Sequence, residues 1–278
     1  MSKVSVIMPC YNDGAYIEEA VQSVHAQTYK DIELIIIDDG SDDEHTLNVL
    51  NNFKQSGIKV LRTERLGPAG ARNAGIAAAA GKYILPLDAD DKIEPEYIEK
   101  AVKVLEENEH ISVVFCYANL FGERSGRWGL PNYSFEKMLL DNIVFVTALF
   151  YKEDWEKVGG FRVEMKHGME DYDFWLSIME LGREIYQIPE VLFHYRIKPK
   201  SRTSEFMRNA EIVKQTYRDI YYNHPVFYEK YKDQYAVILR DALIEQLFIN
   251  RKLQETIKIL EKIKRIPILK YIIKKYIM

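Results

Sequence analysis

Residues 4–12 read VSVIMPCYN, an apolar run that ends abruptly in polar side chains. Short runs of the same kind, rich in β-branched and other apolar residues, follow at 33–37, 59–61, 83–87 and 113–116. Segments with the apolar spacing of helices lie between them, at 15–26, 43–55, 69–80 and 95–107. Strands that alternate with helices in this way form βαβ units. We therefore predict an α/β fold with a mostly parallel central sheet and helices on both faces.

Polar residues cluster directly after four of these predicted strands. The clusters occupy residues 9–13, 38–42, 65–73 and 88–91, and they contain acids, amides, hydroxyls and arginines. Helix capping explains any one cluster about as well as ligand binding does. Four consecutive clusters, two of them with three acids each, exceed what capping requires. Because ligands of open α/β sheets bind beyond the carboxyl ends of the strands, we expect a binding cleft at this edge.

Asp88 and Asp90 lie two residues apart just after an apolar run. In an extended segment both side chains point the same way, and two carboxylates repel unless a cation lies between them. Mg²⁺ or Mn²⁺ is the natural partner, since both prefer oxygen ligands. The alternative is that these acids only turn the chain and cap the helix that follows.

A second acidic cluster begins the segment 168–175, which reads GMEDYDFW. Acids at a helix start favour the helix dipole, and that explanation suits Asp173. The bulky apolar neighbours of Glu170 and Asp171 point to another role, because partial burial raises a carboxyl pKa and suits it to proton abstraction. Both residues are therefore candidates for a general base.

Composition excludes several classes of protein. The chain has 278 residues and a formal net charge of −4, which does not favour a nucleic-acid partner. Cys10 and Cys116 have no spacing typical of a metal site or a disulfide framework. No apolar run reaches the roughly 18 residues that a membrane-spanning helix needs. We expect a cytoplasmic protein, with the inner face of the cell membrane as a candidate location.

Together the motifs resemble the family 2 glycosyltransferases of the GT-A fold, a Rossmann-like architecture. The resemblance spans residues 3 to 198 and is carried by 4–12, DDGS at 38–41, GARN at 70–73, DADD at 88–91 and the Glu170-Asp171 pair. It implies an inverting, metal-dependent hexosyl- or N-acetylhexosaminyltransferase that takes a sugar from a nucleotide diphosphate, with a UDP-sugar favoured. A glycan or lipid-linked oligosaccharide of the cell surface would be the acceptor.

The resemblance also implies roles for individual residues. The nucleotide-sugar pocket would contain Pro9, Tyr11, Asn12, Asp39, Arg72 and Asp88. Asp90 would bind Mn²⁺ or Mg²⁺, and His194 lies where many such enzymes carry a late metal ligand, although a structural histidine is an equal alternative. Asp171 would be the general base, with Glu170 positioning the acceptor. Gly159 and Gly160 resemble the glycine loop that leaves room for acceptor and sugar, or else a simple turn.

One departure from the family narrows the expected reaction. Processive members carry a Gln-x-x-Arg-Trp motif after the base, and no such motif follows Asp171. We therefore expect transfer of a single sugar. A glycoside hydrolase, which also uses paired carboxylates, and a non-catalytic module that kept the fold are the alternatives.

The C-terminal part is expected to be helical and distinct. A proline and polar residues near 198–201 suggest a GT-A nucleotide-sugar-binding and catalytic domain over residues 1–202 and a helical region over 203–278. Residues 251–278 contain nine Lys or Arg and two acids, and 268–277 carries a broad apolar stripe. Such a helix suits an anionic membrane surface. Docking on its own domain or on a second subunit of a homo-oligomer is the alternative.

Overall fold

The computed structural model describes residues 2–199 and 201–264, which fall into two compact units, Met1–Glu229 and Lys230–Met278. Within the described residues the first unit contains a sheet of nine strands. These strands are β1 Val4–Cys10, β2 Ile32–Asp38, β3 Lys59–Arg62, β4 Tyr83–Pro86, β5 Lys92–Ile93, β6 Ile111–Gly122, β7 Gly126–Arg127, β8 Leu149–Tyr151 and β9 Glu184–Ile197. Their order across the sheet is β3-β2-β1-β4-β8-β6-β9-β5, and β7 pairs with β6.

The N-terminal half of the sheet is parallel, as predicted. β1 pairs with β2 so that Cys10 lies opposite Asp38, and it pairs with β4 on its other side. The carboxyl ends of these strands therefore meet at one edge. The remainder is mixed, because the short β8 runs antiparallel to both β4 and β6, while β6 and β9 are parallel.

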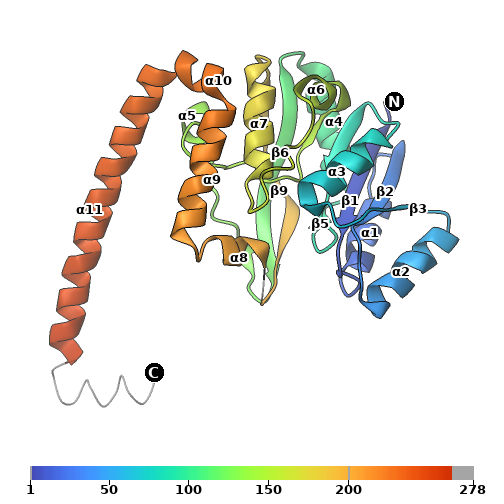
Figure 1. The fold of residues 1–278 in the computed structure, drawn as a ribbon, viewed down its shortest axis with the longest axis horizontal. Coiled ribbons are helices and arrows are strands. Elements are labelled where there is room, and N and C mark those ends of the chain that lie inside the picture. Colours follow the sequence, from blue (N-terminus) through green and yellow to red (C-terminus); the bar gives the residue numbers. More distant parts are fainter. Residues whose placement is uncertain (1, 200, 265–278) are drawn as a thin grey trace. The chain divides into compact units, whose positions relative to one another are not determined.

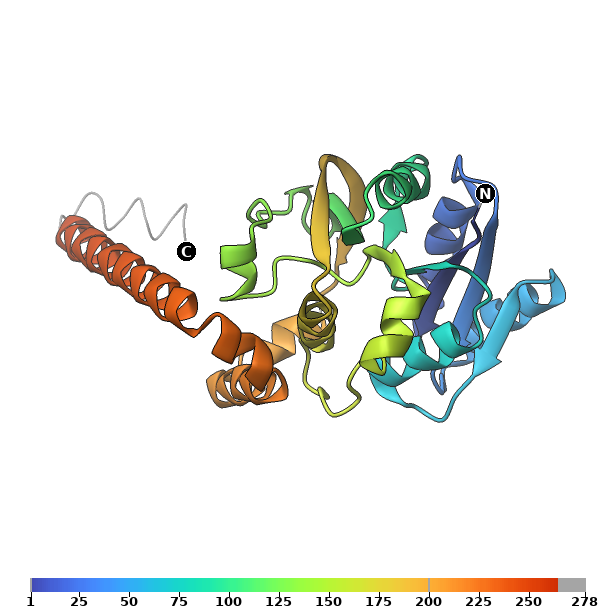
Figure 2. The same ribbon diagram turned by 90° about the horizontal axis from the view of Figure 1, so that it is seen from above.

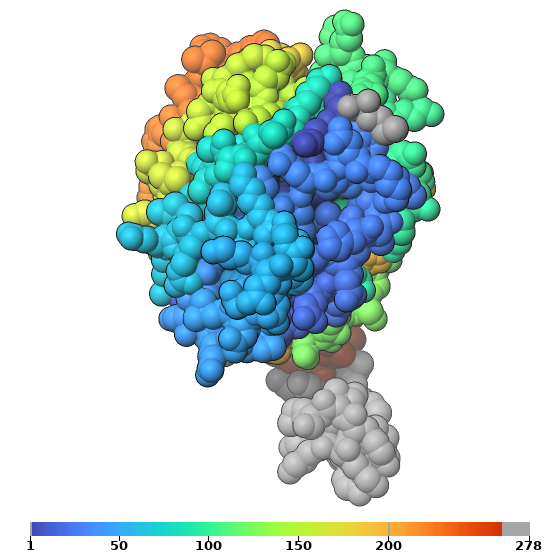
Figure 3. Space-filling model, turned by 90° about the vertical axis from the view of Figure 1, so that its right-hand side faces the viewer, coloured from blue at the N-terminus to red at the C-terminus, as the bar shows by residue number. Residues whose placement is uncertain are grey.

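Helices cover both faces of this sheet, which confirms the α/β class. In two views α1 and α4 lie on one face and α3 and α6 lie on the other (Figures 1 and 2). The helices of this unit are α1 Ile17–His25, α2 Glu44–Gln55, α3 Gly67–Ala77, α4 Tyr97–Glu107, α5 Phe135–Met138, α6 Lys152–Val158, α7 Glu170–Glu180, α8 Arg202–Phe206, α9 Ala210–Asn223 and α10 Pro225–Lys230. The N-terminal half forms the face shown in blue and cyan in Figure 3.

The core between these layers positions the site. β1 is almost fully buried, and a side chain on Gly75 of α3 would lie 2.5 Å from Ile7 and 2.6 Å from Ile37. Glycine at this position therefore allows α3 to pack directly on β1 and β2. Arg72, one turn earlier on α3, is thereby held at the edge where the parallel strands end.

The first unit extends beyond the predicted boundary between residues 202 and 203. Phe206, Ile220 and Phe227, which belong to α8, α9 and α10, are all buried. Asp173 of α7 also accepts a hydrogen bond from Asn223 Nδ2 at 2.7 Å. These contacts join the three helices to the first unit, which ends at Glu229.

The second unit contains α11, Lys232–Lys264. Its large apolar side chains, among them Leu243, Phe248 and Leu253, are exposed. No helix of the described residues is both long enough and apolar enough to cross a membrane. The membrane-binding stripe predicted at 268–277 lies outside the described residues.

Candidate active site

The parallel strands end at a cavity of about 770 Å³, which gathers most of the predicted site. Eight predicted residues line it: Pro9, Tyr11, Asp39, Arg72, Asp88, Asp90, Glu170 and Asp171. They come from four strand ends or helix starts and from α7, far apart in the sequence. Four predicted residues do not line it: Asn12, Gly159, Gly160 and His194.

One end of the cavity is built by Tyr11 and Asp39. The Arg65 guanidinium carbon lies 4.4 Å from the centroid of the Tyr11 ring. Asp39 is buried, and its carboxylate accepts hydrogen bonds from the backbone N–H groups of Leu66 at 2.6 Å and Gly67 at 2.8 Å. Asp39 therefore holds the loop before α3 while lining the cavity. A flat aromatic ring beside an arginine and an acid is a suitable environment for a planar base.

Arg72 joins the two acidic clusters across the cavity. Its guanidinium lies 2.7 Å from Asp88 and 2.8 Å from Glu170, and it is almost fully buried. Burial alone would lower its pKa, but the two acids raise it, so Arg72 stays charged. Arg202 adds a bidentate contact to Glu170, at 2.9 and 3.1 Å. Such paired buried charges fix the relative position of α3 and α7.

Asp90 has a lysine as its partner. Lys198 Nζ lies 2.7 Å from Asp90 Oδ2 and 2.9 Å from Asp13 Oδ1. Burial raises the pKa of Asp90, Lys198 lowers it, and Asp88 and Asp13 raise it further. The neighbouring Asp91 is buried and accepts a hydrogen bond from the Arg196 backbone N–H at 2.8 Å. Burial and the charges of Asp90 and Asp88 raise the pKa of Asp91 well above its ordinary value.

The oxygen ligands at Asp90 fit a hard divalent cation. Mg²⁺ is commonly held by one or two carboxylates while substrate phosphates and water complete its shell. Asp90 supplies one carboxylate, and Asp13 and Asp88 add negative charge nearby. Across residues 2–199 and 201–264 no group of three His, Cys, Asp or Glu side chains could hold a metal ion. The donor set therefore fits an ion that arrives with phosphate, once Lys198 leaves Asp90.

Glu170 and Asp171 are adjacent, but their pKa values shift in opposite directions. Burial favours the neutral form of Glu170, yet Arg72 and Arg202 hold its pKa below the ordinary value. Asp171 forms no salt bridge with any described residue, and burial together with the charge of Glu170 raises its pKa to about 6. Its Oδ1 accepts the Tyr172 backbone N–H at 2.9 Å. Arg72, this N–H group and the Asn142 side chain act in the opposite direction and lower the pKa of Asp171. Asp171 can thus be ionised at neutral pH and still accept a proton.

Two of the residues outside the cavity have structural partners. His194 lies on β9 between the cavity-lining Phe193 and Tyr195, so its side chain points to the opposite face. Its Nε2 lies 2.6 Å from Glu94 Oε1. Asn12 adopts a left-handed backbone (φ 57°), and its side-chain oxygen accepts the Asp42 backbone N–H at 3.0 Å. Asn12 therefore joins the loop after β1 to the loop before α2.

Gly159 and Gly160 form the turn after α6. Both have positive φ, 81° and 83°, and Gly159 caps the helix. A side chain on Gly160 would lie 2.7 Å from Asn73 Oδ1 and 2.8 Å from Trp155 Nε1. The turn thus packs on α3 rather than on the cavity.

Many residues of the cavity were not predicted, among them Asn142, Trp128 and Tyr195. The residues 119–142 contain no motif that marks them. Tyr195 had no sequence signal either, because placing His194 in the site implied that its neighbour on the strand faced away.

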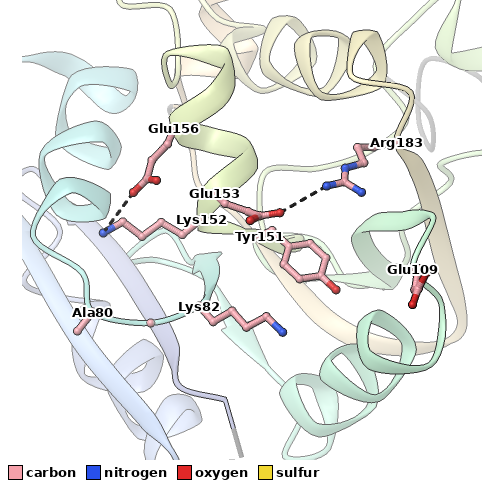
Figure 4. A pocket seen from close by; sticks show the side chains of 9 residues that line it. Ala80, Lys82, Glu109, Tyr151, Lys152, Glu153, Glu156 and Arg183 are labelled. Atoms are coloured by element: carbon pink, nitrogen blue, oxygen red, sulfur yellow. Dashed lines mark hydrogen bonds and ion pairs between the residues drawn. The ribbon is translucent and has the colours of Figure 1, made fainter.

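A second pocket of about 570 Å³ lies at the other end of β4 (Figure 4). Its charged side chains pair with one another, Lys152 with Glu156 at 3.9 Å and Arg183 with Glu153 at 3.4 Å. None of the predicted site residues lines it.

The chain is similar in sequence to a known protein family and in fold to solved structures. Residues 5–163 match the family described as glycosyl transferase family 2. An uncharacterized glycosyltransferase of Haemophilus influenzae is 32% identical over 221 residues, which cover 73% of this chain and 68% of that protein. The structure of S. aureus TarS 1-349 in complex with UDP-GlcNAc is similar in fold, with a TM-score of 0.62 at 22% identity, covering 73% of this chain and 60% of that one. This chain thus spans less than two thirds of that TarS chain.

The Pyrobaculum calidifontis mannosyltransferase PcManGT, solved with GDP-Man and Mn²⁺, has a TM-score of 0.61 at 19% identity. The match covers 91% of this chain and 80% of that one. These two structures support the GT-A fold. The family match covers more than half of the chain, and the Haemophilus influenzae relative is 32% identical over 73% of it. This chain therefore belongs to glycosyl transferase family 2.

Proposed function

We propose that the chain transfers one sugar from a UDP-sugar to a glycan or lipid-linked acceptor, with inversion at the anomeric carbon. The observation that carries the proposal is the meeting of Asp39, Asp90 and Asp171 in one cavity. A nucleotide-binding end, an acid suited to a phosphate-bound cation and an unpaired acid with raised pKa are the three parts such a reaction needs. TarS was solved with UDP-GlcNAc, which favours uridine as the nucleoside.

In this mechanism the acceptor oxygen attacks the anomeric carbon from the face opposite the nucleotide. The new carbon–oxygen bond forms as the bond to the phosphate oxygen breaks. Asp171 takes the acceptor proton, and the bonding pair leaves with the nucleoside diphosphate. A single displacement of this kind inverts the configuration. Proton transfer by a positioned base is typically worth ~10²–10⁴ in rate.

Charge on the departing diphosphate needs a cationic environment. Asp90 would hold Mg²⁺ or Mn²⁺, which stabilises that negative charge when bound. Lys198 and Arg202 lie at the same end of β9 and already touch cavity acids. Lys198, released from Asp90, would gain a phosphate partner in place of a carboxylate.

A nucleotide panel tests the proposal. UDP, GDP and their sugars are added with Mn²⁺, and protection against heat is measured. UDP compounds should raise the melting temperature, and chelation should reduce the gain. Release of UDP with acceptor present, and the product anomer determined by NMR, then test transfer and inversion. Protection by GDP compounds alone would overturn the uridine assignment.

Membrane contact stays part of the proposal for the C-terminal region. A lipid-linked acceptor would be reached most readily from a membrane surface. Truncation before residue 268 should then reduce sedimentation with anionic liposomes. Unchanged sedimentation would leave docking on protein as the role of this segment.

A further inference from the structure

The cavity has two unlike walls, and only one is needed for the nucleotide sugar. The first carries Asp39, Arg72, Asp88 and Asp90 from the strand ends. The second comes from β6, β9 and the segment between β7 and β8, and its residues are largely apolar. Its members include Leu120, Trp128, Leu130, Phe145, Phe193 and Tyr195. These six side chains carry no charge to offer a diphosphate, so the wall they form is suited to another ligand.

Trp128 is the rigid centre of this wall. Its ring stacks on Tyr195, with centroids 4.6 Å apart and planes inclined by 25°. It is also nearly parallel to Phe145, at 5.9 Å and 14°. Its backbone N–H donates to the Ala118 carbonyl at 2.9 Å, which ties it to β6. These contacts fix the orientation of an indole that remains partly exposed.

The wall behind Trp128 is equally firm. Phe145 packs against Phe193 at 4.5 Å between centroids and against Phe115 at 5.5 Å. Phe193 and Tyr195 both project from β9 toward the cavity. An aromatic surface held from two strands keeps its shape before any ligand arrives. Such pre-organisation lowers the entropic cost of binding a flat ligand.

The polar groups around this wall distinguish a sugar from a lipid chain. Arg124, Asn142 and His167 line the same cavity and can hydrogen-bond to hydroxyl groups. Asn142 and Asp171 line the same cavity, so this polar group and the candidate base face one space. Arg124 and His167 are exposed and keep their water, but a lipid chain would desolvate the half-buried Asn142, which costs free energy. A pyranose ring has an apolar face for the indole and hydroxyls at its rim.

We propose that Trp128, stacked on Tyr195, is the acceptor subsite and that its ligand is a sugar ring of a glycan. This inference rests on the proposed function, because it places the acceptor in the same cavity as the donor. It adds the class of acceptor and the residue that recognises it. The acceptor hydroxyl would meet Asp171 while the ring lies on Trp128.

The test uses the full chain with UDP and Mn²⁺ bound and measures quenching of tryptophan fluorescence. The probes are methyl glucoside, methyl N-acetylglucosaminide and maltose, compared with octanol and octyl glucoside. Sugars should quench the wild type. Trp128→Ala should weaken sugar binding about 10-fold or more, measured by calorimetry, since stacked rings contribute about 1–3 kcal/mol to recognition. Trp128→Phe should retain most of the affinity.

Tyr186→Ala is the matched control, because Tyr186 is an exposed aromatic residue of the same strand that does not line the cavity. It should bind the sugars like the wild type. Thermal protection by UDP shows that each variant is folded and that the nucleotide site is intact, independently of the acceptor. Sugar affinity unchanged in Trp128→Ala overturns the proposal, as does a wild type that responds to octanol and not to sugars. If UDP protects the protein but the sugars do not bind, the acceptor subsite is wrong, while the nucleotide site of the proposed function still holds.

Discussion

The acids that follow β4 and the acids that begin α7 line the same cavity, but they meet different neighbours. Asp88 pairs with Arg72, and Asp90 pairs with Lys198. At the start of α7, Glu170 is held by two arginines while Asp171 has no cationic partner among the described residues. In the proposed mechanism Asp90 of the first cluster would exchange Lys198 for a metal ion. The second contains a single acid that is left to take up a proton.

The contrast between Glu170 and Asp171 teaches how one helix start serves two purposes. The buried Glu170 stays charged because Arg72 and Arg202 compensate for its desolvation. That fixed charge, together with burial, raises the pKa of Asp171 to about 6. In the proposed mechanism Glu170 would therefore position α7 and raise the pKa of the proposed base beside it.

Replacing the unpaired acid should have the largest effect. Asp171→Asn keeps the shape but cannot accept a proton, so we expect kcat to fall by ~10²–10⁴. The dissociation constant of UDP, measured by calorimetry, should stay near the wild-type value. Asp173→Asn is the control, because Asp173 pairs with Arg162 and Asn223 and should affect stability instead. Normal turnover in Asp171→Asn would show that Asp171 is not the general base.

Replacing the paired acid should mainly lower stability. Glu170→Gln leaves Arg72 and Arg202 with weakened partners, and breaking a buried ion pair costs about 3 kcal/mol. Chemical denaturation should show this loss in the free energy of unfolding. Glu153→Gln, in an exposed ion pair with Arg183, should cost under about 1 kcal/mol. Equal losses in the two variants would show that Glu170 does not hold the helices together.

The acids of the site could be predicted from the sequence, but their partners could not. The parallel strands and the acids at their ends are local features, since an apolar run and the residues directly after it are adjacent in the chain. Asp88, Asp90, Glu170 and Asp171 were therefore predicted, and all four line the cavity. The partners of these acids come from distant segments, and pairing at such range has no sequence signal.

His194 shows why the remainder could not be predicted. Its direction depends on the register of β9 against β6, which shifts at Cys116/Tyr117 and Tyr117/Ala118. A one-residue shift turns a side chain to the other face of a sheet. The sequence marks a histidine near the strand end, but the pairing of β9 with β5, in which His194 lies opposite Lys92, brings it beside Glu94. Asn142 and Trp128 lie in loops whose path is set by the same strands.

Removing the exchangeable acid should weaken donor binding. Asp90→Asn takes away the charged ligand proposed for the metal ion, and a charge-assisted contact is worth about 1.5–3 kcal/mol, or about 10–100-fold in affinity. Calorimetric titration of UDP should show this loss with Mn²⁺ present and little change with chelator. If the Asp90→Asn protein binds UDP as tightly as the wild type with Mn²⁺, Asp90 does not bind the metal ion.

A last effect, on the free energy of unfolding, follows from the raised pKa of Asp171. A carboxyl group that titrates near 6 in the folded protein and near 4 in the unfolded chain makes folding less favourable as pH rises through that interval. Its cost is complete above pH 6 and absent well below 4. Asp171→Asn should therefore stabilise the protein by up to about 3 kcal/mol at pH 7.5 and by little near pH 4. Denaturation at both pH values measures the difference, and a gain that is independent of pH would place its origin in packing rather than charge.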